Sequence, residues 1–289
     1  MTARIIDGNA HAAALRGELK LAAAALADRG IRPGLAVIVV GKDTASQIYV
    51  RNKVRACEEA GVLSELHEFA ADVPERRVAE RIRELNADSG IDGVLVQLPL
   101  PPHIDEARLL ACVAPEKDVD GFHVHSAGAL MLGAPHFVPC TPAGIMYLLE
   151  KENIPLAGRH ALVIGRSNIV GKPVALLLLQ KDATVTICHS KTAGLGDHTR
   201  NADILVVAAG RLNLVDASMV KEGACVIDVG TNRTAEGKLR GDVDFESVKE
   251  KAGFITPVPG GVGPMTVAML LANTLRSANQ RIQDRNEPK

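Results

Sequence analysis

Short apolar runs recur along the chain and predict the strands of a sheet. Each run is bounded by Gly, Pro, Asp or Asn, and most runs are continuous and β-branched rather than alternating. Continuous apolar runs are typical of strands buried on both faces, as in a parallel sheet. The runs cover Leu35–Val40, Gly93–Leu98, Ala161–Ile164, Thr184–Cys188, Ile204–Ala208 and Cys225–Val229.

Helical stretches lie between these runs. The first, His11–Arg29, is rich in Ala and Leu and stops before Gly30, a residue suited to a helix end. Further helices are expected at Gln47–Ala60, Pro74–Asn86, Pro142–Glu152, Pro173–Gln180 and Met265–Asn279. The alternation of strands and helices predicts an α/β fold. The polar tail after Gln280 is expected to fray.

The length of 289 residues suggests about two domains. A stretch rich in Gly, Ala and Ser, His125–Pro135, precedes a plausible boundary near Val138–Thr141. A helix then leads into a fresh βαβ unit, so the second domain is expected to begin there.

Composition excludes several classes of protein. With 33 Lys+Arg against 34 Asp+Glu, the chain has no overall drive toward nucleic acid or an anionic membrane. No apolar run approaches the roughly 20 residues of a membrane span, and the N-terminus lacks a secretory pattern, so the cytoplasm is expected. The five cysteines are widely spaced without a CxxC pair, which favours small buried side chains over disulfides or a metal site.

The strongest local feature is HALVIGRSNIVGKPVALLLL, from His160 to Leu179. A buried strand runs into the turn Gly165-Arg166-Ser167-Asn168-Ile169-Val170-Gly171, and Pro173 then opens a helix. Strand, glycine turn and helix N-terminus together suit a pyrophosphate. The spacing is GxSxxxG rather than GxGxxG, and a plain tight turn is the alternative interpretation.

The next strand indicates which dinucleotide is bound. An NAD site often places an acid after this strand, but here the chain reads His189-Ser190-Lys191-Thr192. Hydroxyls and cations, with Arg166, favour a 2′-phosphate and hence NADP, against the alternative of a solvated basic turn. Gly210, Gly230 and Thr231 end two later strands and are expected near the nicotinamide, although Gly210 fits ordinary strand termination equally well.

Four other segments carry candidate chemistry. Tyr49 and Lys53 are four residues apart on one helix face, which alone is better explained as an exposed pair. Gln97 follows a buried strand and precedes consecutive prolines. The remaining two are PEKDVDGFH at 115–123, and the Pro/Gly loop ITPVPGGVGPMT at 255–266, which suits close approach of a ligand.

Several motifs in one order carry a family resemblance. YVRNK, VQLPLP, KDVDGFH, PCTPAG, GRSNIVGKP and PVPGGVGPMT resemble those of the bifunctional methylenetetrahydrofolate dehydrogenase/cyclohydrolase family, over about Asn9 to Asn279. The resemblance implies two α/β domains flanking a cleft, the second a Rossmann-type NADP-binding domain. The expected division is 1–140 plus 268–289 for the catalytic, folate-binding domain and 141–267 for the NADP-binding domain. The family is typically a homodimer through the NADP domain.

The resemblance also assigns residue roles. Lys53 matches the catalytic lysine, Tyr49 the tyrosine beside it, Gln97 the glutamine that contacts the lysine, and Asp120 the acid that holds the pterin. Substrate contacts are implied for these four together with Leu98, Pro99, Pro259, Gly260, Gly261, Val262 and Gly263. NADP contacts are implied for Gly165, Arg166, Ser167, Ile169, Val170, Gly171, Ser190 and Thr231, and no metal is expected.

The implied chemistry suits these residue types. Oxidation of 5,10-methylenetetrahydrofolate gives a resonance-stabilised methenyl cation, so hydride transfer needs mainly positioning. Hydrolysis to 10-formyltetrahydrofolate needs proton transfer, which a lysine performs only when burial and weakly stabilising neighbours favour its neutral form. A neutral Gln97 is compatible with that, and Asp120 can accept hydrogen bonds from pterin N–H groups.

Three features depart from the family's usual pattern. Ser126 stands where an Asn is common, and Thr231 stands where an aliphatic residue is common. His160 and, separately, the HVHSAGAL stretch at 123–130 are also unusual. The alternatives are a dehydrogenase without cyclohydrolase activity, which Lys53, Tyr49 and Gln97 argue against, and a non-catalytic dinucleotide-binding regulator. A fragment of a ligase-fused protein is disfavoured, because the chain has no further ATP-dependent domain and no GxxxxGK[ST] motif.

Overall fold

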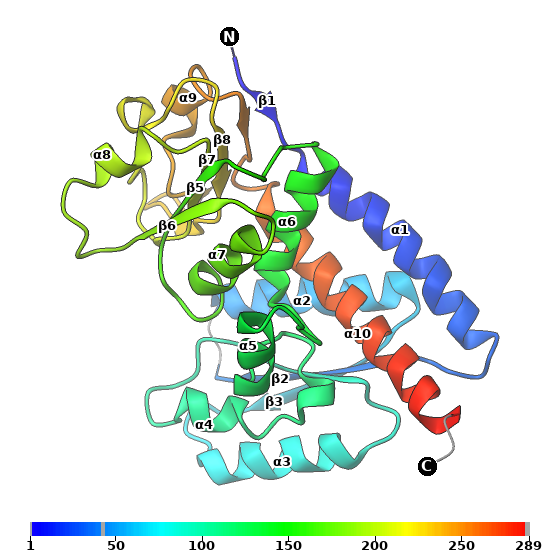
Figure 1. The fold of residues 1–289 in the computed structure, drawn as a ribbon. Helices are drawn as coiled ribbons and strands as arrows, with labels where there is room; N and C mark the ends of the chain where they lie inside the picture. Colours follow the sequence, from blue (N-terminus) through cyan, green and yellow to red (C-terminus); the bar gives the residue numbers. More distant parts are fainter. Residues whose placement is uncertain (1, 42–43, 287–289) are drawn as a thin grey trace. The chain divides into compact units, whose positions relative to one another are not determined.

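The computed structural model describes residues 2–41 and 44–286, which form two compact units (Figure 1). Unit 1 comprises Met1–Ala12 and Thr141–Thr266, and unit 2 comprises Ala13–Cys140 and Val267–Lys289. The expected division assigned residues 1–140 to one domain. The contact pattern instead groups the first twelve residues with unit 1, because β1 (Arg4–Ile5) pairs with a strand of that unit.

Unit 2 is built on a three-stranded parallel sheet in the order β3-β2-β4. The central strand β2 (Gly34–Val40) is buried at every position, as its continuous apolar run predicts. Its alternate residues enter two separate cores. Leu35, Val37 and Val39 pack with residues of α1 (Gly8–Ala27), α2 (Thr44–Ala60) and α10 (Val262–Asn286), whereas Ala36 and Ile38 pack with α3 (Glu75–Ala87).

The strand β3 (Leu63–Phe69) was not among the predicted strands. Its sequence, LSELHEF, has polar residues at four of seven positions, and the strand is only half-buried because β3 lies at the edge of the sheet. A continuous apolar run is the signature of a strand buried on both faces, and β3 has no such run. The predicted β4 run is also shorter than expected, since β4 covers Gly93–Val96.

Unit 1 contains a six-stranded parallel sheet in the order β1-β11-β8-β7-β5-β6. The four predicted strands of this region are confirmed, and they form four neighbouring strands of the sheet. Their bounds are β5 (His160–Ile164), β6 (Thr184–Cys188), β7 (Ile204–Val207) and β8 (Cys225–Asp228). The short strand β11 (Phe254–Ile255) joins them to β1.

The other elements of unit 1 are short except for two helices, α6 (Cys140–Lys151), which begins with the last residue of unit 2, and α7 (Gly171–Leu179). The short elements include α8 (Leu195–Thr199), α9 (Phe245–Val248) and the hairpin of β9 (Asn232–Arg233) with β10 (Leu239–Arg240). Unit 2 adds α4 (Glu106–Leu110) and α5 (Val124–Met131).

The C-terminal helix extends further than expected. The polar tail was expected to fray after Gln280, but α10 runs to Asn286. Arg281 forms an ion pair with the buried Asp92, with 2.9 Å between Nε and Oδ1, and this pairing holds the last turns in place. Within the described residues, no helix combines the length and apolar character needed to cross a membrane.

Candidate active site

In unit 2, α2 and β4 bring Lys53 and Gln97 together. Lys53 is 8% exposed, and its Nζ donates to Gln97 Oε1 at 3.0 Å. The other end of the Gln97 amide donates from Nε2 to the Leu98 carbonyl at 2.7 Å, which fixes the oxygen toward the lysine. The Leu98–Pro99 peptide is cis. The buried amine therefore has an uncharged hydrogen-bond acceptor as its partner.

Tyr49 lies one helical turn before Lys53 on α2 and is 37% exposed. The two residues therefore differ in environment, although the same i,i+4 spacing links them. The interpretation of the pair as simply exposed is wrong for Lys53, which is buried, whereas Tyr49 remains accessible to a ligand.

Asp120 completes a group of polar side chains around Lys53. Desolvation raises the pKa of the Asp120 carboxyl, while the charge of Lys53 acts in the opposite direction. The Cys140 thiol is buried, and this burial raises its pKa well above the ordinary value, so it stays a neutral donor. The thiol donates to the Val119 carbonyl at 3.4 Å.

The turn that carries Asp120 is held by a second acid, Asp118. Its carboxylate accepts hydrogen bonds from the backbone of Phe122 at 3.1 Å and His123 at 2.9 Å. Ser126 Oγ donates to the same carboxylate at 2.7 Å and is buried. Ser126, which stands where the family commonly has an Asn, thus stabilises the turn from its C-terminal side.

In unit 1, the predicted phosphate loop leads from β5 into α7. Ser167 Oγ accepts from the backbone N–H of Val170 at 3.1 Å and of Gly171 at 3.2 Å. Gly165 and Gly171 approach so closely that a Cβ on Gly171 would lie 2.3 Å from the Gly165 carbonyl oxygen. Only glycine fits here, and the loop therefore turns tightly from β5 into the N-terminus of α7, a place that suits an anion.

Exposed polar groups flank this loop at the carboxyl ends of β5 and β6. The side chains of Arg166, Ser190 and Lys191 are all exposed, and Thr192 Oγ1 accepts from the His189 backbone at 2.9 Å to order the turn. Two cations and a hydroxyl suit the binding of a phosphate. Residues 189–192 contain no acid that would repel it. Ile169 and Val170 are half-buried.

Two buried carboxylates, Asp242 and Asp228, support the next two strand ends, and neither role has a signature in the sequence. Asp242 accepts from the backbone of Ala209, Gly210 and Arg211 at 2.7 to 2.8 Å. Asp228 accepts from Gly230 at 2.9 Å, and desolvation raises its pKa to about 6. The exposed Thr231 follows Gly230, so the candidate nicotinamide end of the site rests on this fixed backbone.

The Pro/Gly loop also lies in unit 1 and runs into α10, whose first turn contains Val262 and Gly263. The Gly260 carbonyl accepts from the Asn9 backbone at 3.0 Å. Gly8 packs against Gly261 so closely that a Cβ on Gly8 would lie 1.7 Å from the Gly261 carbonyl oxygen. The residues at the start of the chain therefore hold this loop.

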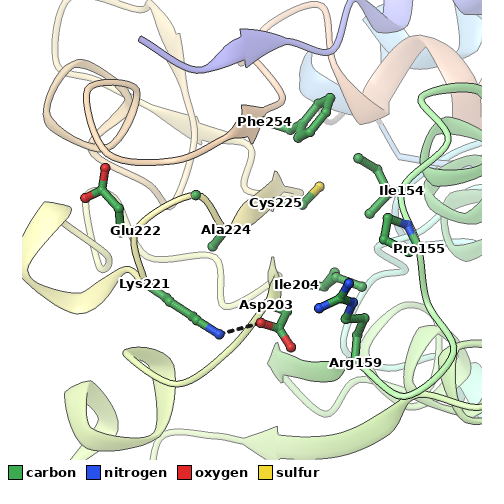
Figure 2. A pocket seen from close by; sticks show the side chains of 11 residues that line it. Ile154, Pro155, Arg159, Asp203, Ile204, Lys221, Glu222, Ala224, Cys225 and Phe254 are labelled. Atoms are coloured by element: carbon green, nitrogen blue, oxygen red, sulfur yellow. Dashed lines mark hydrogen bonds and ion pairs between the residues drawn. The ribbon is translucent and has the colours of Figure 1, made fainter. Parts of the chain in front are cut away.

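A cavity of about 240 Å³ opens at the opposite edge of the unit 1 sheet (Figure 2). Its lining includes Arg159, Asp203 and Ala224, which precede β5, β7 and β8, so it lies at the amino ends of the strands. Lys221 pairs with Asp203 beside it. None of the predicted substrate or cofactor residues lines this cavity. Among the described residues, no cluster of His, Cys, Asp and Glu has the geometry to hold a metal.

Comparison with known families matches both parts of the chain. Residues 6–120 match the model "Tetrahydrofolate dehydrogenase/cyclohydrolase, catalytic domain", and residues 139–282 match "Tetrahydrofolate dehydrogenase/cyclohydrolase, NAD(P)-binding domain". The bifunctional protein FolD of Nitrosospira multiformis is 60% identical over 280 residues, which is 97% of each chain. That of Ralstonia pickettii is 62% identical over the same length and share.

Solved structures agree with these sequence relatives. FolD from Campylobacter jejuni, a methylenetetrahydrofolate dehydrogenase/cyclohydrolase, superposes with a TM-score of 0.94 at 49% identity, over 96% of this chain and 99% of that one. The dehydrogenase-cyclohydrolase of Trypanosoma brucei, complexed with NADP cofactor and inhibitor, has a TM-score of 0.95 at 41% identity, over 98% and 99% of the two chains.

Proposed function

The chain belongs to the tetrahydrofolate dehydrogenase/cyclohydrolase family, and on this premise we propose that Lys53, Gln97, Tyr49 and Asp120 are its catalytic group. The protein is a bifunctional enzyme of one-carbon metabolism. It oxidises 5,10-methylenetetrahydrofolate to the 5,10-methenyl form with NADP⁺ and hydrolyses that product to 10-formyltetrahydrofolate. The observation that carries the residue assignment is the buried Lys53–Gln97 hydrogen bond beside Asp120.

The phosphate loop fits the cofactor. Gly165, Ser167, Ile169, Val170 and Gly171 form the turn that would hold the pyrophosphate at the N-terminus of α7. Arg166 and Ser190 would bind the 2′-phosphate, and the backbone at Thr231 would contact the nicotinamide end. When bound, NADP⁺ supplies the acceptor for the hydride that leaves the methylene bridge.

The protein's task in oxidation is positioning, because the methenyl cation is stabilised by its own two nitrogens. Asp120 accepts hydrogen bonds from the pterin N–H groups, since a carboxylate is an acceptor with several sites. Tyr49, accessible on α2, contacts the substrate beside the lysine. Leu98 and Pro99, and the loop of Pro259, Gly260, Gly261, Val262 and Gly263, are proposed as further substrate contacts.

Hydrolysis requires proton transfer, which we assign to Lys53. A water oxygen adds to the methenyl carbon, and the neutral amine accepts the proton that the water loses. As the bond from that carbon to N5 breaks, the new hydroxyl loses its proton and becomes the formyl C=O, N5 takes up one proton, and one proton in total is released to solvent. Gln97 holds the amine in place through a neutral acceptor and leaves the proton free to move.

A spectrophotometric assay tests this function directly. Methylenetetrahydrofolate with NADP⁺ should give methenyl product, and methenyltetrahydrofolate without cofactor should be hydrolysed faster than in buffer. A dehydrogenase lacking cyclohydrolase activity would pass only the first test, a cofactor-binding regulator would pass neither, and methenyl formation with neither NADP⁺ nor NAD⁺ would overturn the assignment.

We also propose that the enzyme is a homodimer joined through unit 1. The strand β6 lies at an edge of the sheet, and an exposed edge presents unpaired backbone groups that invite a partner strand. Ile187 on β6 is 42% exposed and Leu179 at the end of α7 is 57% exposed. Light scattering should give twice the chain mass for the wild type and the chain mass for Ile187→Lys.

The cytoplasm is the proposed location. All five cysteines are free thiols and four of them are buried, which is compatible with a reducing compartment. Fractionation of the source cells, followed by detection with an antibody, would test this location.

A further inference from the structure

A single asparagine on α10 lies behind the Asp120 turn. Asn273 interrupts an apolar stretch of the helix and is half-buried in unit 2. Its amide nitrogen donates to the Val119 carbonyl at 2.8 Å and to the Val138 carbonyl at 3.2 Å. Both amide hydrogens are therefore used on backbone that belongs to loops and not to a regular element.

The first of these acceptors is the carbonyl of the peptide that leads into Asp120. Rotation of that peptide would swing the Asp120 side chain, so the hydrogen bond from Asn273 fixes the direction in which the carboxylate points. The Cys140 sulfur lies beside this hydrogen bond, 3.7 Å from the Asn273 amide nitrogen and 3.4 Å from the same Val119 oxygen.

The peptide after Asp120 is fixed in a different way. Gly121 has φ of +73°, and a Cβ at this position would lie 2.7 Å from the Pro139 nitrogen. Gly121 therefore packs directly on the segment Val138–Pro139, and Asn273 binds the Val138 carbonyl of the same segment. The backbone on both sides of Asp120 is thus held against one segment, and Asn273 is the side chain that joins the two.

We infer that Asn273 is a positioning residue that aims the Asp120 carboxylate at the pterin and so sets the affinity for folate in both reactions. This inference rests on the proposed role of Asp120. Since both reactions use the same bound pterin, loss of the amide changes their folate KM values together and leaves the KM for NADP⁺ unchanged.

Steady-state kinetics of Asn273→Ala test the proposal. The KM for methylenetetrahydrofolate in the dehydrogenase assay and the KM for methenyltetrahydrofolate in the cyclohydrolase assay should each rise by about tenfold. The KM for NADP⁺ should stay within about twofold. A purely structural role would instead reduce the fraction of active enzyme, lower both kcat values and leave KM unchanged, and that result would overturn the inference.

Two variants of α10 serve as matched controls. Ser277 Oγ donates to the Glu116 carbonyl at 2.9 Å, one turn further along the same helix, and Thr274 Oγ1 donates to Leu270 within the helix. Ser277→Ala and Thr274→Val each remove one hydrogen bond made by a side chain of α10, and neither bond involves Val119. They should leave the folate KM values unchanged, and a tenfold rise in either would show that any loss on α10 has the same effect.

Asp120→Asn separates failure of the inference from failure of the proposed function. If Asp120→Asn leaves the folate KM unchanged in an active wild type, the role of Asp120 is wrong. If Asp120→Asn raises it and Asn273→Ala does not, only the inference is wrong. The variant that carries both Asn273→Ala and Asp120→Asn should have the same folate KM as Asp120→Asn alone. Additive increases in the folate KM would contradict the inference that Asn273 acts through Asp120. Should Asn273→Ala not fold, Asn273→Ser retains one donor and should give an intermediate folate KM.

Discussion

The Lys53 amine donates to the Gln97 side-chain oxygen at 3.0 Å, and the Gln97 amide is held in that orientation by its bond to the Leu98 carbonyl. The partner of the buried lysine is thus neutral and fixed. Glutamate has the same shape as glutamine, so a Glu at position 97 would keep the contact and change only how strongly the Lys53 amine holds its proton.

Gln97→Glu should move the cyclohydrolase activity to higher pH. A carboxylate stabilises the ammonium form of Lys53, so a more alkaline solution is needed to free the amine. The pH at which the rate reaches half its maximum should rise by about one pH unit, with a lower rate at neutral pH. An unchanged pH profile would contradict the role of a neutral partner.

Lys53→Met should abolish most of the cyclohydrolase activity. Loss of a positioned acid–base group typically costs about 10²- to 10⁴-fold in rate, and a methionine fills the buried site without a proton to exchange. The cyclohydrolase rate is measured by the decay of methenyltetrahydrofolate absorbance, with stopped-flow mixing where the reaction is fast. Arg51→Met on the exposed face of the same helix is the control and should stay near the wild-type rate. Full cyclohydrolase activity in Lys53→Met would exclude this role.

Arg166→Ala should weaken binding of NADP⁺ more than binding of NAD⁺. The guanidinium is exposed beside the phosphate loop and would pair with a 2′-phosphate that NAD⁺ lacks. The KM for NADP⁺ should rise about tenfold, corresponding to about 1.4 kcal/mol, while that for NAD⁺ changes little. Arg200→Ala, whose side chain already pairs with Asp197, is the control. Equal increases for both cofactors would place Arg166 away from the 2′-phosphate.

Stability should depend on pH through Asp228. Its pKa is raised by burial to about 6, so the native state keeps the proton to a higher pH than the unfolded chain does. The contribution to the free energy of unfolding is therefore present below about pH 4 and falls by about 3 kcal/mol as pH rises through 6. Urea unfolding between pH 4.5 and 7 should show a flatter dependence for Asp228→Asn. Asp216→Asn, at an exposed carboxyl whose pKa is lowered by Ser218, should not flatten it.

Arg281→Met should destabilise unit 2. Asp92 is 1% exposed, and its arginine is 25% exposed, so the ion pair is shielded from solvent on the side of the acid. Removing the cation leaves a buried charge poorly compensated, and we expect a loss of about 2 kcal/mol in the free energy of unfolding. Arg55→Met, which breaks the exposed pair with Glu59, should cost less than about 0.5 kcal/mol. Equal losses would show that burial of Asp92 is unimportant.

The parts of the site that were predictable are those with a local signature. The phosphate loop has one, because a buried run, two glycines and a helix start follow each other within the segment His160–Leu179. Lys53 and Gln97 lie on separate elements, and their assignment depended on family motifs. Their contact is formed by the packing of α2 beside the sheet, which no spacing along the chain encodes.

The supporting residues were not predictable for the same physical reason. A lone Asn such as Asn273 within an apolar helix has no periodic signal, and its partners are more than 130 positions away. Asp242 reads as an ordinary loop acid, yet it accepts three backbone hydrogen bonds after β7. The edge strand β3 was missed because half-buried positions tolerate polar residues.

Neither unit is continuous in the sequence, and this has a consequence for the order of folding during synthesis. Leu270, Leu271 and Leu275 of α10 fill the core of unit 2, although most of that unit is made first. Until α10 has been synthesised, one face of the sheet that contains β2 lacks part of its apolar cover, whereas all of unit 1 precedes Val267 in the chain. Most of unit 2, the stretch with Lys53 included, is thus made before residues 141–266 of unit 1, yet its core is completed only after them.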